Sequence, residues 1–144
     1  MCFKGSKSST TSTTGTKVTS SGGQWSWGGW VDCPGMPALT APAAQAGATV
    51  TARGQWGQST VSAEHQVRVV RVGNPYQPTE VIATSNTSSG QSGYVTATKT
   101  IDVAAGDEFK LQIWASRGQS GSVVAPNNGI FGWGASPGTY LEVA

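Results

Sequence analysis

The chain has 144 residues, enough for one domain, and its formal net charge is +2 with 11% charged residues. Leu is rare, while Gly, Ser and Thr exceed a third of the chain; this composition excludes a helical bundle or coiled coil and favours strands. The low net charge argues against disorder of the whole chain. We expect no membrane span and no secretory signal, because no apolar stretch is long enough.

Residues 1–23 are expected to form an extended N-terminal arm. Half of them are Ser or Thr, and their only charges are Lys4, Lys7 and Lys17. Such a segment cannot bury enough apolar surface to fold alone, so it is either a disordered leader or an arm that becomes ordered against a partner. Three dispersed lysines are too few to predict direct nucleic-acid binding.

Residues 24–47 are interpreted as a linker or docking segment that is rich in Trp, Pro and Gly. Trp25 and Trp27 are two positions apart, which places them on one face of an extended chain, and Trp30 follows a Gly-Gly pair. These indoles either cap the core of the domain or dock on a partner. The prolines of the segment oppose a helix or a central strand.

Residues 48–144 predict an antiparallel β-sandwich or jelly roll. Short segments rich in Val, Thr and aromatic residues alternate with turn residues, and no amphipathic helix interrupts them. The expected strands are residues 48–53, 61–72, 79–84, 94–100, 108–115, 130–133 and 139–143. Within 61–72 the apolar residues change parity after Val69, which indicates a β-bulge or a strand buried on both sides.

Residues 108–115 give the cleanest half-buried strand, with alternate positions apolar. This pattern turns Lys110 and Trp114 to the outer side of the sheet. The predicted core comprises Val67, Val69, Val95, Phe109, Leu111, Ile113 and Leu141.

The stretch Ile101-Asp-Val-Ala-Ala-Gly-Asp-Glu-Phe-Lys-Leu-Gln-Ile-Trp114, with the closing segment Gly138-Thr-Tyr-Leu-Glu-Val143, resembles the second half of a tumour-necrosis-factor/C1q-like jelly roll. The long segment 61–72 resembles an inner-sheet strand of that family. The resemblance implies a jelly-roll module that forms a homo-oligomer, with a trimer as the expected state. Modules of this kind occur in bacteriophage virions as capsid-decoration, fibre and tail proteins.

Catalytic and metal-binding patterns are weak. His65 lies within a predicted strand, where alternation sends Glu64 to the opposite face, so a half-exposed structural histidine is expected and no enzyme is predicted. Cys2 and Cys33 are expected as free thiols, with a single disulfide as the alternative. Asp102 and Asp107 flank a turn and could reach Ca²⁺, but local backbone bonding is the simpler expectation. No cofactor or metal is predicted.

Aromatic residues are the remaining functional candidates. Trp56, Tyr76, Trp114 and Trp133 are predicted in or near loops, or on the outer side of a strand, where they would pack on another subunit or stack on sugar rings. We therefore expect a non-enzymatic virion protein that acts by oligomerisation and by docking of its arm on major capsid or tail proteins. The alternative is a module that recognises cell-surface glycan through exposed Trp and loops.

Overall fold

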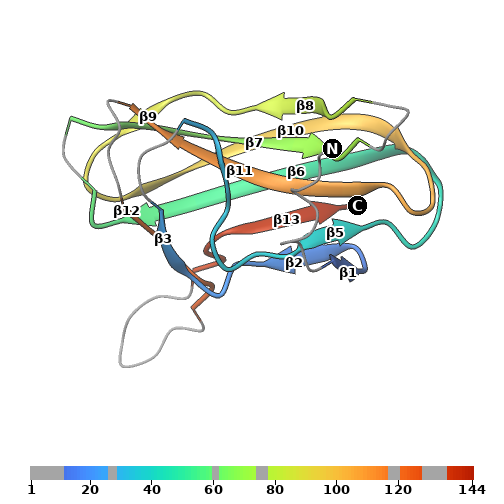
Figure 1. Cartoon of the computed structure of the whole chain (residues 1–144), viewed down its shortest axis with the longest axis horizontal. Helices are drawn as coiled ribbons and strands as arrows, with labels where there is room; N and C mark the ends of the chain where they lie inside the picture. Colours follow the sequence, from blue (N-terminus) through green and yellow to red (C-terminus); the bar gives the residue numbers. More distant parts are fainter. Residues whose placement is uncertain (1–11, 26–28, 60–61, 74–77, 117–120, 128–135) are drawn as a thin grey trace.

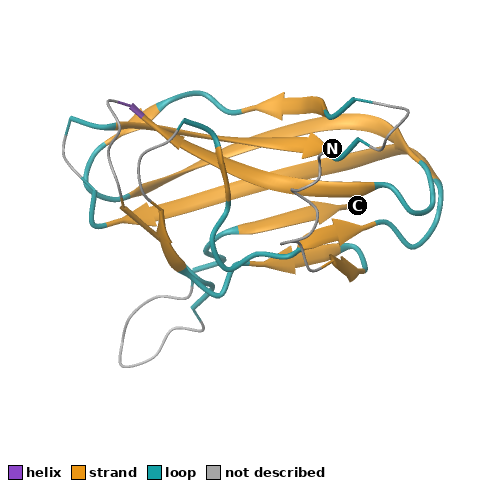
Figure 2. Ribbon diagram, in the orientation of Figure 1, coloured by secondary structure: helices purple, strands orange, loops and turns teal. Residues whose placement is uncertain are grey.

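The computed structural model describes residues 12–25, 29–59, 62–73, 78–116, 121–127 and 136–144. These residues form two β-sheets that pack face to face, with strands in both layers and loops at the two ends (Figures 1 and 2). The expected all-β sandwich is therefore confirmed.

The described residues contribute seven strands to one layer, which we call sheet A. Its spatial order is β1-β5-β11-β7-β8, while β4 pairs with β11 and β9 pairs with β7. The bounds are β1 Ser12–Thr14, β4 Val31–Asp32, β5 Ala38–Thr40, β7 Glu64–Arg71, β8 Glu80–Thr84, β9 Ser88–Ser89 and β11 Glu108–Ala115. All of these pairs are antiparallel except that of β1 with β5.

The other layer, sheet B, is built around one long strand, β6. Its order is β2-β13-β6-β12-β3, and β10 pairs with β6 along nearly the whole of its length. The bounds are β2 Lys17–Thr19, β3 Gly23–Trp25, β6 Gln45–Gly57, β10 Gly93–Val103, β12 Gly121–Val123 and β13 Tyr140–Val143. The closing strand β13 thus lies between β6 and the early strand β2.

The core lies between the two sheets and follows from side-chain alternation. Along β11, every second residue is buried and its neighbours are partly exposed, as the sequence predicts. The predicted core residues are all buried: Val67, Val69, Val95, Phe109, Leu111, Ile113 and Leu141. Trp114 is on the outer side of β11, also as predicted.

The change in the apolar pattern after Val69 coincides with burial on both sides of β7 and with a bulge in the neighbouring strand β8. Val69 packs in the inter-sheet core, and the next residue, Val70, is also buried although it points to the other side of the strand. The register between β7 and β8 shifts at this point, where Val69 pairs with Ala83 and Val70 with Val81. The extra residue, Ile82, belongs to β8 and turns into the core.

The N-terminal part of the chain corrects the predicted boundary at residue 48. Strands β1 to β5 come from residues 12–40, and they hydrogen-bond into both sheets. Val18 and Leu39 are buried in the common core, with exposed fractions of 5% and 0%. The described residues among 12–40 are therefore neither a separate arm nor a linker; they complete the sandwich because remote strands supply the partners that these short segments lack.

Leu111→Ala tests the core assignment. Leu111 is 2% exposed on the central strand β11, so we expect the substitution to lower the free energy of unfolding by about 2–5 kcal/mol. Thr84→Ala, at an exposed position of β8, is the control and should change it by less than about 0.5 kcal/mol. Urea unfolding measures both, and equal effects would contradict the assignment.

Val18→Ala tests the integration of the early strands. Its side chain is buried opposite Leu141 of β13, so the variant should lose about 1–3 kcal/mol of unfolding free energy. The neighbouring exposed residue supplies the control Thr19→Ala. A dispensable arm would instead tolerate both substitutions without a change in the urea midpoint.

Candidate interaction surfaces

Five threonines of the neighbouring strands β6 and β10 lie together on the outer side of sheet B. β6 and β10 pair in a register that sets Thr51 opposite Thr98 and Thr49 opposite Thr100, and the Oγ1 atoms of Thr51 and Thr98 are 3.3 Å apart. Ala48, Val50, Ala52 and Ala97, which flank Thr49, Thr51 and Thr98, are buried in the core, so alternation turns the threonines outward. We call this surface the threonine face; it comprises Thr49, Thr51, Arg53, Gln55, Tyr94, Thr96, Thr98 and Thr100.

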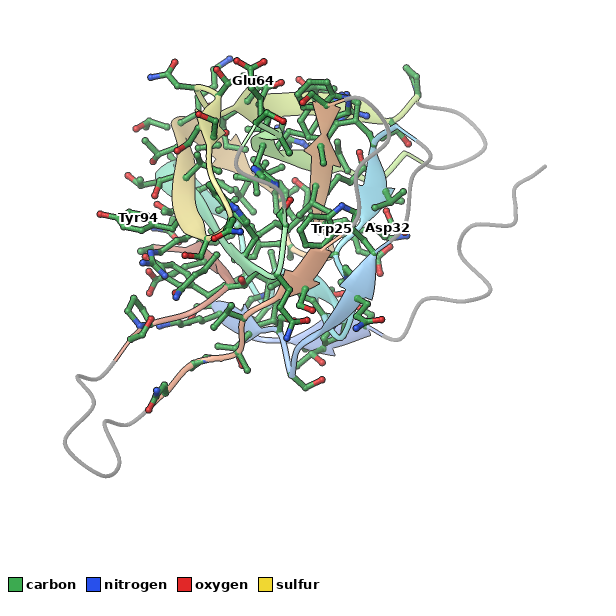
Figure 3. All side chains as sticks on the ribbon, turned by 90° about the vertical axis from the view of Figure 1, so that its left-hand side faces the viewer. Trp25, Asp32, Glu64 and Tyr94 are labelled. Carbon is green, nitrogen blue, oxygen red and sulfur yellow. The ribbon has the colours of Figure 1, made fainter. Side chains whose placement is uncertain are left out.

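Two tyrosines on the outer side of sheet B each lie under a cation. The Arg53 guanidinium is 4.1 Å from the centre of the Tyr94 ring, and the Lys17 ammonium is 4.6 Å from that of Tyr140. Arg53 also donates hydrogen bonds to Gln55 Oε1 and to the Gly138 carbonyl oxygen. Tyr94 still exposes 60% of its surface and projects away from the sandwich, on the side opposite to Asp32 (Figure 3).

The outer side of sheet A carries the second surface, the tryptophan face, which comprises Trp30, Asp32, Arg68, Lys110, Gln112 and Trp114. Trp30 immediately precedes β4, whose pairing with β11 places it beside Trp114. The two ring centres are 6.3 Å apart, with an interplanar angle of 32°. Both indoles are partly exposed, so together they form a small aromatic platform.

A chain of polar contacts runs across the same face. Lys110 Nζ donates to Asp32 Oδ2 at 3.1 Å, and Gln112 Nε2 donates to Asp32 Oδ1 at 3.0 Å. Arg68 Nε then donates to Gln112 Oε1 at 2.9 Å, and the Arg68 guanidinium lies 4.4 Å from the centre of the Trp30 ring. These contacts hold the long polar side chains in fixed positions next to the aromatic platform.

One end of the sandwich is filled by three buried rings. His65 stacks on Trp56 with ring centres 4.1 Å apart, and its edge meets Trp25 at 6.1 Å. Glycines make room for the indoles, since a Cβ on Gly121 would lie 2.6 Å from Trp25 and one on Gly93 would lie 3.0 Å from Trp56. The cavity beside these rings has a volume of about 20 Å³, room for roughly one water, so it does not hold a ligand.

This buried end corrects the predictions for Trp56 and His65 and, for Trp25, selects the core alternative over docking. Trp25 and Trp56 are 7% and 4% exposed, so neither offers a docking or ligand surface, and His65 is 3% exposed rather than half-exposed. Figure 3 shows Trp25 within the body of the sandwich. The sequence did indicate this burial. Trp56 is an even number of residues from Val50 and Ala52, and His65 is two residues from Val67, so each ring lies on the core side of its strand.

His65 is held as a neutral imidazole. Its Nδ1 lies 3.3 Å from the Ser88 carbonyl oxygen, which can only accept, so Nδ1 carries the proton. The Ser59 hydroxyl then donates to Nε2 at 2.9 Å. Burial lowers the pKa of His65, and the hydrogen bond to the Ser88 carbonyl only partly opposes that effect.

The Ser59–His65 pair lacks the features of a hydrolytic site. Both side chains are buried, and the partner of Nδ1 is a backbone carbonyl instead of a carboxylate. Glu64 is exposed on the other side of β7 and points away from the pair at the surface of the molecule (Figure 3). This arrangement orders the end of the sandwich and leaves no room for a substrate.

The two aspartates of the 102–107 turn bind the chain itself. Asp107 Oδ2 accepts hydrogen bonds from Ala104 N and Arg71 Nη1, both at 2.9 Å, and Asp102 Oδ1 accepts from Gly47 N at 2.9 Å. The described part of the chain contains no group of three or more His, Cys, Asp or Glu side chains that could hold a metal ion. Burial raises the pKa of the Cys33 thiol to about 12, so it is an unreactive side chain of the core.

The other predicted site residues divide into two groups. Lys17 is exposed in β2, while Trp30 and Trp114 come together on the tryptophan face. Lys4, Lys7, Trp27, Tyr76 and Trp133, together with Cys2 and the expected strand 130–133, lie outside the described residues. Tyr94, Asp32, Arg68 and Gln112 were not among the predicted site residues. Strand alternation marks Tyr94, Arg68 and Gln112 as outward, but only the fold brings Asp32, Arg68 and Gln112 together.

Comparison with known proteins supports the fold. No protein-family model matches the sequence, and no curated protein matches it. A solved structure described as Eiger TNF from S. frugiperda does match, with a TM-score of 0.57 over 89% of this chain and 88% of that chain, at 8% sequence identity. The TNF-like jelly roll expected from residues 101–143 is thereby confirmed, and at this identity the likeness shows the fold alone. Among the described residues, no helix is long and apolar enough to cross a membrane.

The buried imidazole predicts a pH dependence of stability. Because the folded state lowers the pKa of His65 from 6.5, the unfolded state binds a proton first as the pH falls. The stabilisation by neutral His65 is therefore complete above about pH 6.5 and is lost as the pH falls through and below that value. In urea unfolding over this range, the unfolding free energy of the wild type should fall relative to that of His65→Phe as the pH is lowered. Two parallel curves would contradict a buried neutral imidazole.

Proposed function

We propose that this protein is a non-enzymatic structural component of a bacteriophage virion, either a capsid-decoration protein or a tail or fibre component, that acts as a homo-oligomer. A trimer is the expected state. The observation that carries the self-association is the threonine face. The setting in a virion rests on the resemblance of the chain to jelly-roll modules of phage particles and on its charge-poor composition rich in Gly, Ser and Thr.

The threonine face has the chemistry of a surface that another protein covers. Five of its eight side chains are threonines, which are short, β-branched and uncharged. Its one charged side chain is Arg53, whose charge is already engaged by Tyr94, Gln55 and the Gly138 carbonyl. Threonines lose little side-chain entropy when they are covered, and their hydroxyls can form hydrogen bonds with a partner. Tyr94 adds a large, exposed aromatic side chain of the kind that anchors protein interfaces.

A second copy of the chain fits this face better than a strongly charged partner. Glu142 of β13 borders the face, where it lies between Thr51 of β6 and Lys17 of β2. Nucleic acid would need several free cations, which the described residues of this face do not offer. Lys4 and Lys7, which precede the first described strand, and Lys17 of β2 supply the positive charge that would dock the assembly on an acidic region of a major capsid or tail protein.

Thr98→Glu tests the self-association. Thr98 lies at the centre of the threonine face, where a carboxylate in a closed interface would be buried without a partner. In sedimentation velocity we expect the wild type as a single oligomer and Thr98→Glu as a folded monomer with an unchanged far-ultraviolet circular dichroism spectrum.

Thr13→Glu is the matched control, because it makes the same change at an exposed position of β1, at the edge of sheet A. It should keep the oligomer. A wild type that stays monomeric at about 100 μM, or a Thr98→Glu variant that stays oligomeric, would refute the proposed interface. Neighbouring genes for capsid or tail proteins, and the presence of the protein in purified particles, test the virion setting.

A further inference from the structure

Arg68 differs from the other cations of sheet A. Arg71 pairs with Asp107 at 2.9 Å and with Glu80 at 3.4 Å, and Lys110 pairs with Asp32 at 3.1 Å. Arg68 has no carboxylate partner among the described residues; its Nε bonds the neutral Gln112, and its terminal N–H groups donate to none of them. Partial burial lowers the pKa of Arg68, so its charge lies in a less hydrated setting without a counter-ion.

The position of Arg68 is fixed from two sides. Gln112 is oriented by its bond to Asp32, so its oxygen faces Arg68 Nε, and the Trp30 ring contacts the guanidinium. Such positioning leaves the two terminal nitrogens as an ordered pair of donors. A planar guanidinium with free terminal donors matches the geometry of a carboxylate, to which it can donate two parallel hydrogen bonds.

The aromatic platform lies directly beside these donors. Trp30 contacts both Arg68 and Trp114, so the cation and the two indoles form one continuous patch. The C–H groups of a sugar ring pack on an indole face, while its hydroxyls need polar groups at the rim. Asp32, whose side chain is 52% exposed, and Gln112 provide such groups.

We propose that the tryptophan face binds an acidic saccharide, with the carboxylate of the sugar on Arg68 and its ring on the indoles of Trp30 and Trp114. Asp32 does not oppose such a ligand, because Lys110 neutralises its charge. The site goes beyond the structural role proposed above. It lies on the side of the sandwich opposite to Tyr94, so it stays accessible when the threonine face is covered (Figure 3).

The size and character of the patch favour a saccharide over a protein partner. The platform contains two indoles within a polar rim, whereas a stable protein interface buries about 800 Å² on each partner around an apolar centre. An acidic peptide would satisfy Arg68 but would leave the indole faces without a flat apolar counterpart. An acidic sugar satisfies both parts of the patch at once.

Isothermal titration calorimetry of the full chain tests the proposal with four probes: a tetragalacturonate, its methyl ester, a sialic acid tetramer and a tetraglutamate peptide. We expect at least one acidic saccharide to saturate one site per chain, whatever the oligomeric state. The ester and the peptide should bind at least about ten-fold more weakly. The indole N–H resonances of Trp30 and Trp114 should shift with the binding curve.

Arg68→Gln should reduce the affinity at least about ten-fold, and Trp114→Ala should abolish the saturation. Arg53→Gln is the matched control, since Arg53 also lies on an aromatic ring but on the opposite side of the sandwich, and it should bind as the wild type does. Near-ultraviolet circular dichroism verifies that each variant is folded. Absence of binding of both acidic saccharides at about 1 mM, equal binding of the ester or the peptide, or full binding by Arg68→Gln would each overturn the proposal. These results are read per chain, so they stand apart from the sedimentation test of the threonine face.

Discussion

Face-to-face packing of two sheets is the constraint on which the rest of this structure depends. Each long strand must turn alternate side chains into the narrow space between the sheets, and in this chain those positions hold mostly small or β-branched residues. The other half of each strand is then free of packing demands within the subunit. Side chains that bind a partner or a ligand can therefore lie on the outer sides of the sheets without weakening the core.

Local alternation explains why so much of the fold could be predicted. The pattern in residues 108–115 needs no knowledge of neighbouring strands, so the strand, its buried face and the outward position of Trp114 all followed from sequence. The early strands could not be found this way. β2 has three residues and β4 has two, too few to show a period, and the partner of β2 is the last strand of the chain. A polar composition that cannot fold alone does fold when remote strands offer their edges.

Trp25, Trp56 and His65 show where composition misleads. An indole in a segment with Gly and Pro is readily predicted to be exposed. In this fold, Gly121 and Gly93 on the paired neighbouring strands leave the space in which Trp25 and Trp56 are buried. Burial of the imidazole then requires partners for both ring nitrogens, and Ser59 and the Ser88 carbonyl supply them. The aromatic end thus explains the placement of these polar groups, and the indoles available to a ligand are reduced to those outside the sheets.

The two outer sides differ because their cations are neutralised differently. On sheet B, the Arg53 guanidinium contacts the Tyr94 ring and donates hydrogen bonds to Gln55 and a backbone carbonyl. The same surface of a second copy can therefore cover this side at a small desolvation cost. On sheet A, Asp32 neutralises Lys110 and orients Gln112. Gln112 in turn gives Arg68 a neutral hydrogen-bond acceptor and no negative charge. A cation held in place by an amide and a ring keeps most of its attraction for an anion. The pairing of β4 with β11 places Trp30 beside Trp114, and Arg68 lies at the rim of this aromatic platform. The proposed ligand must therefore combine a flat apolar face with an acidic group.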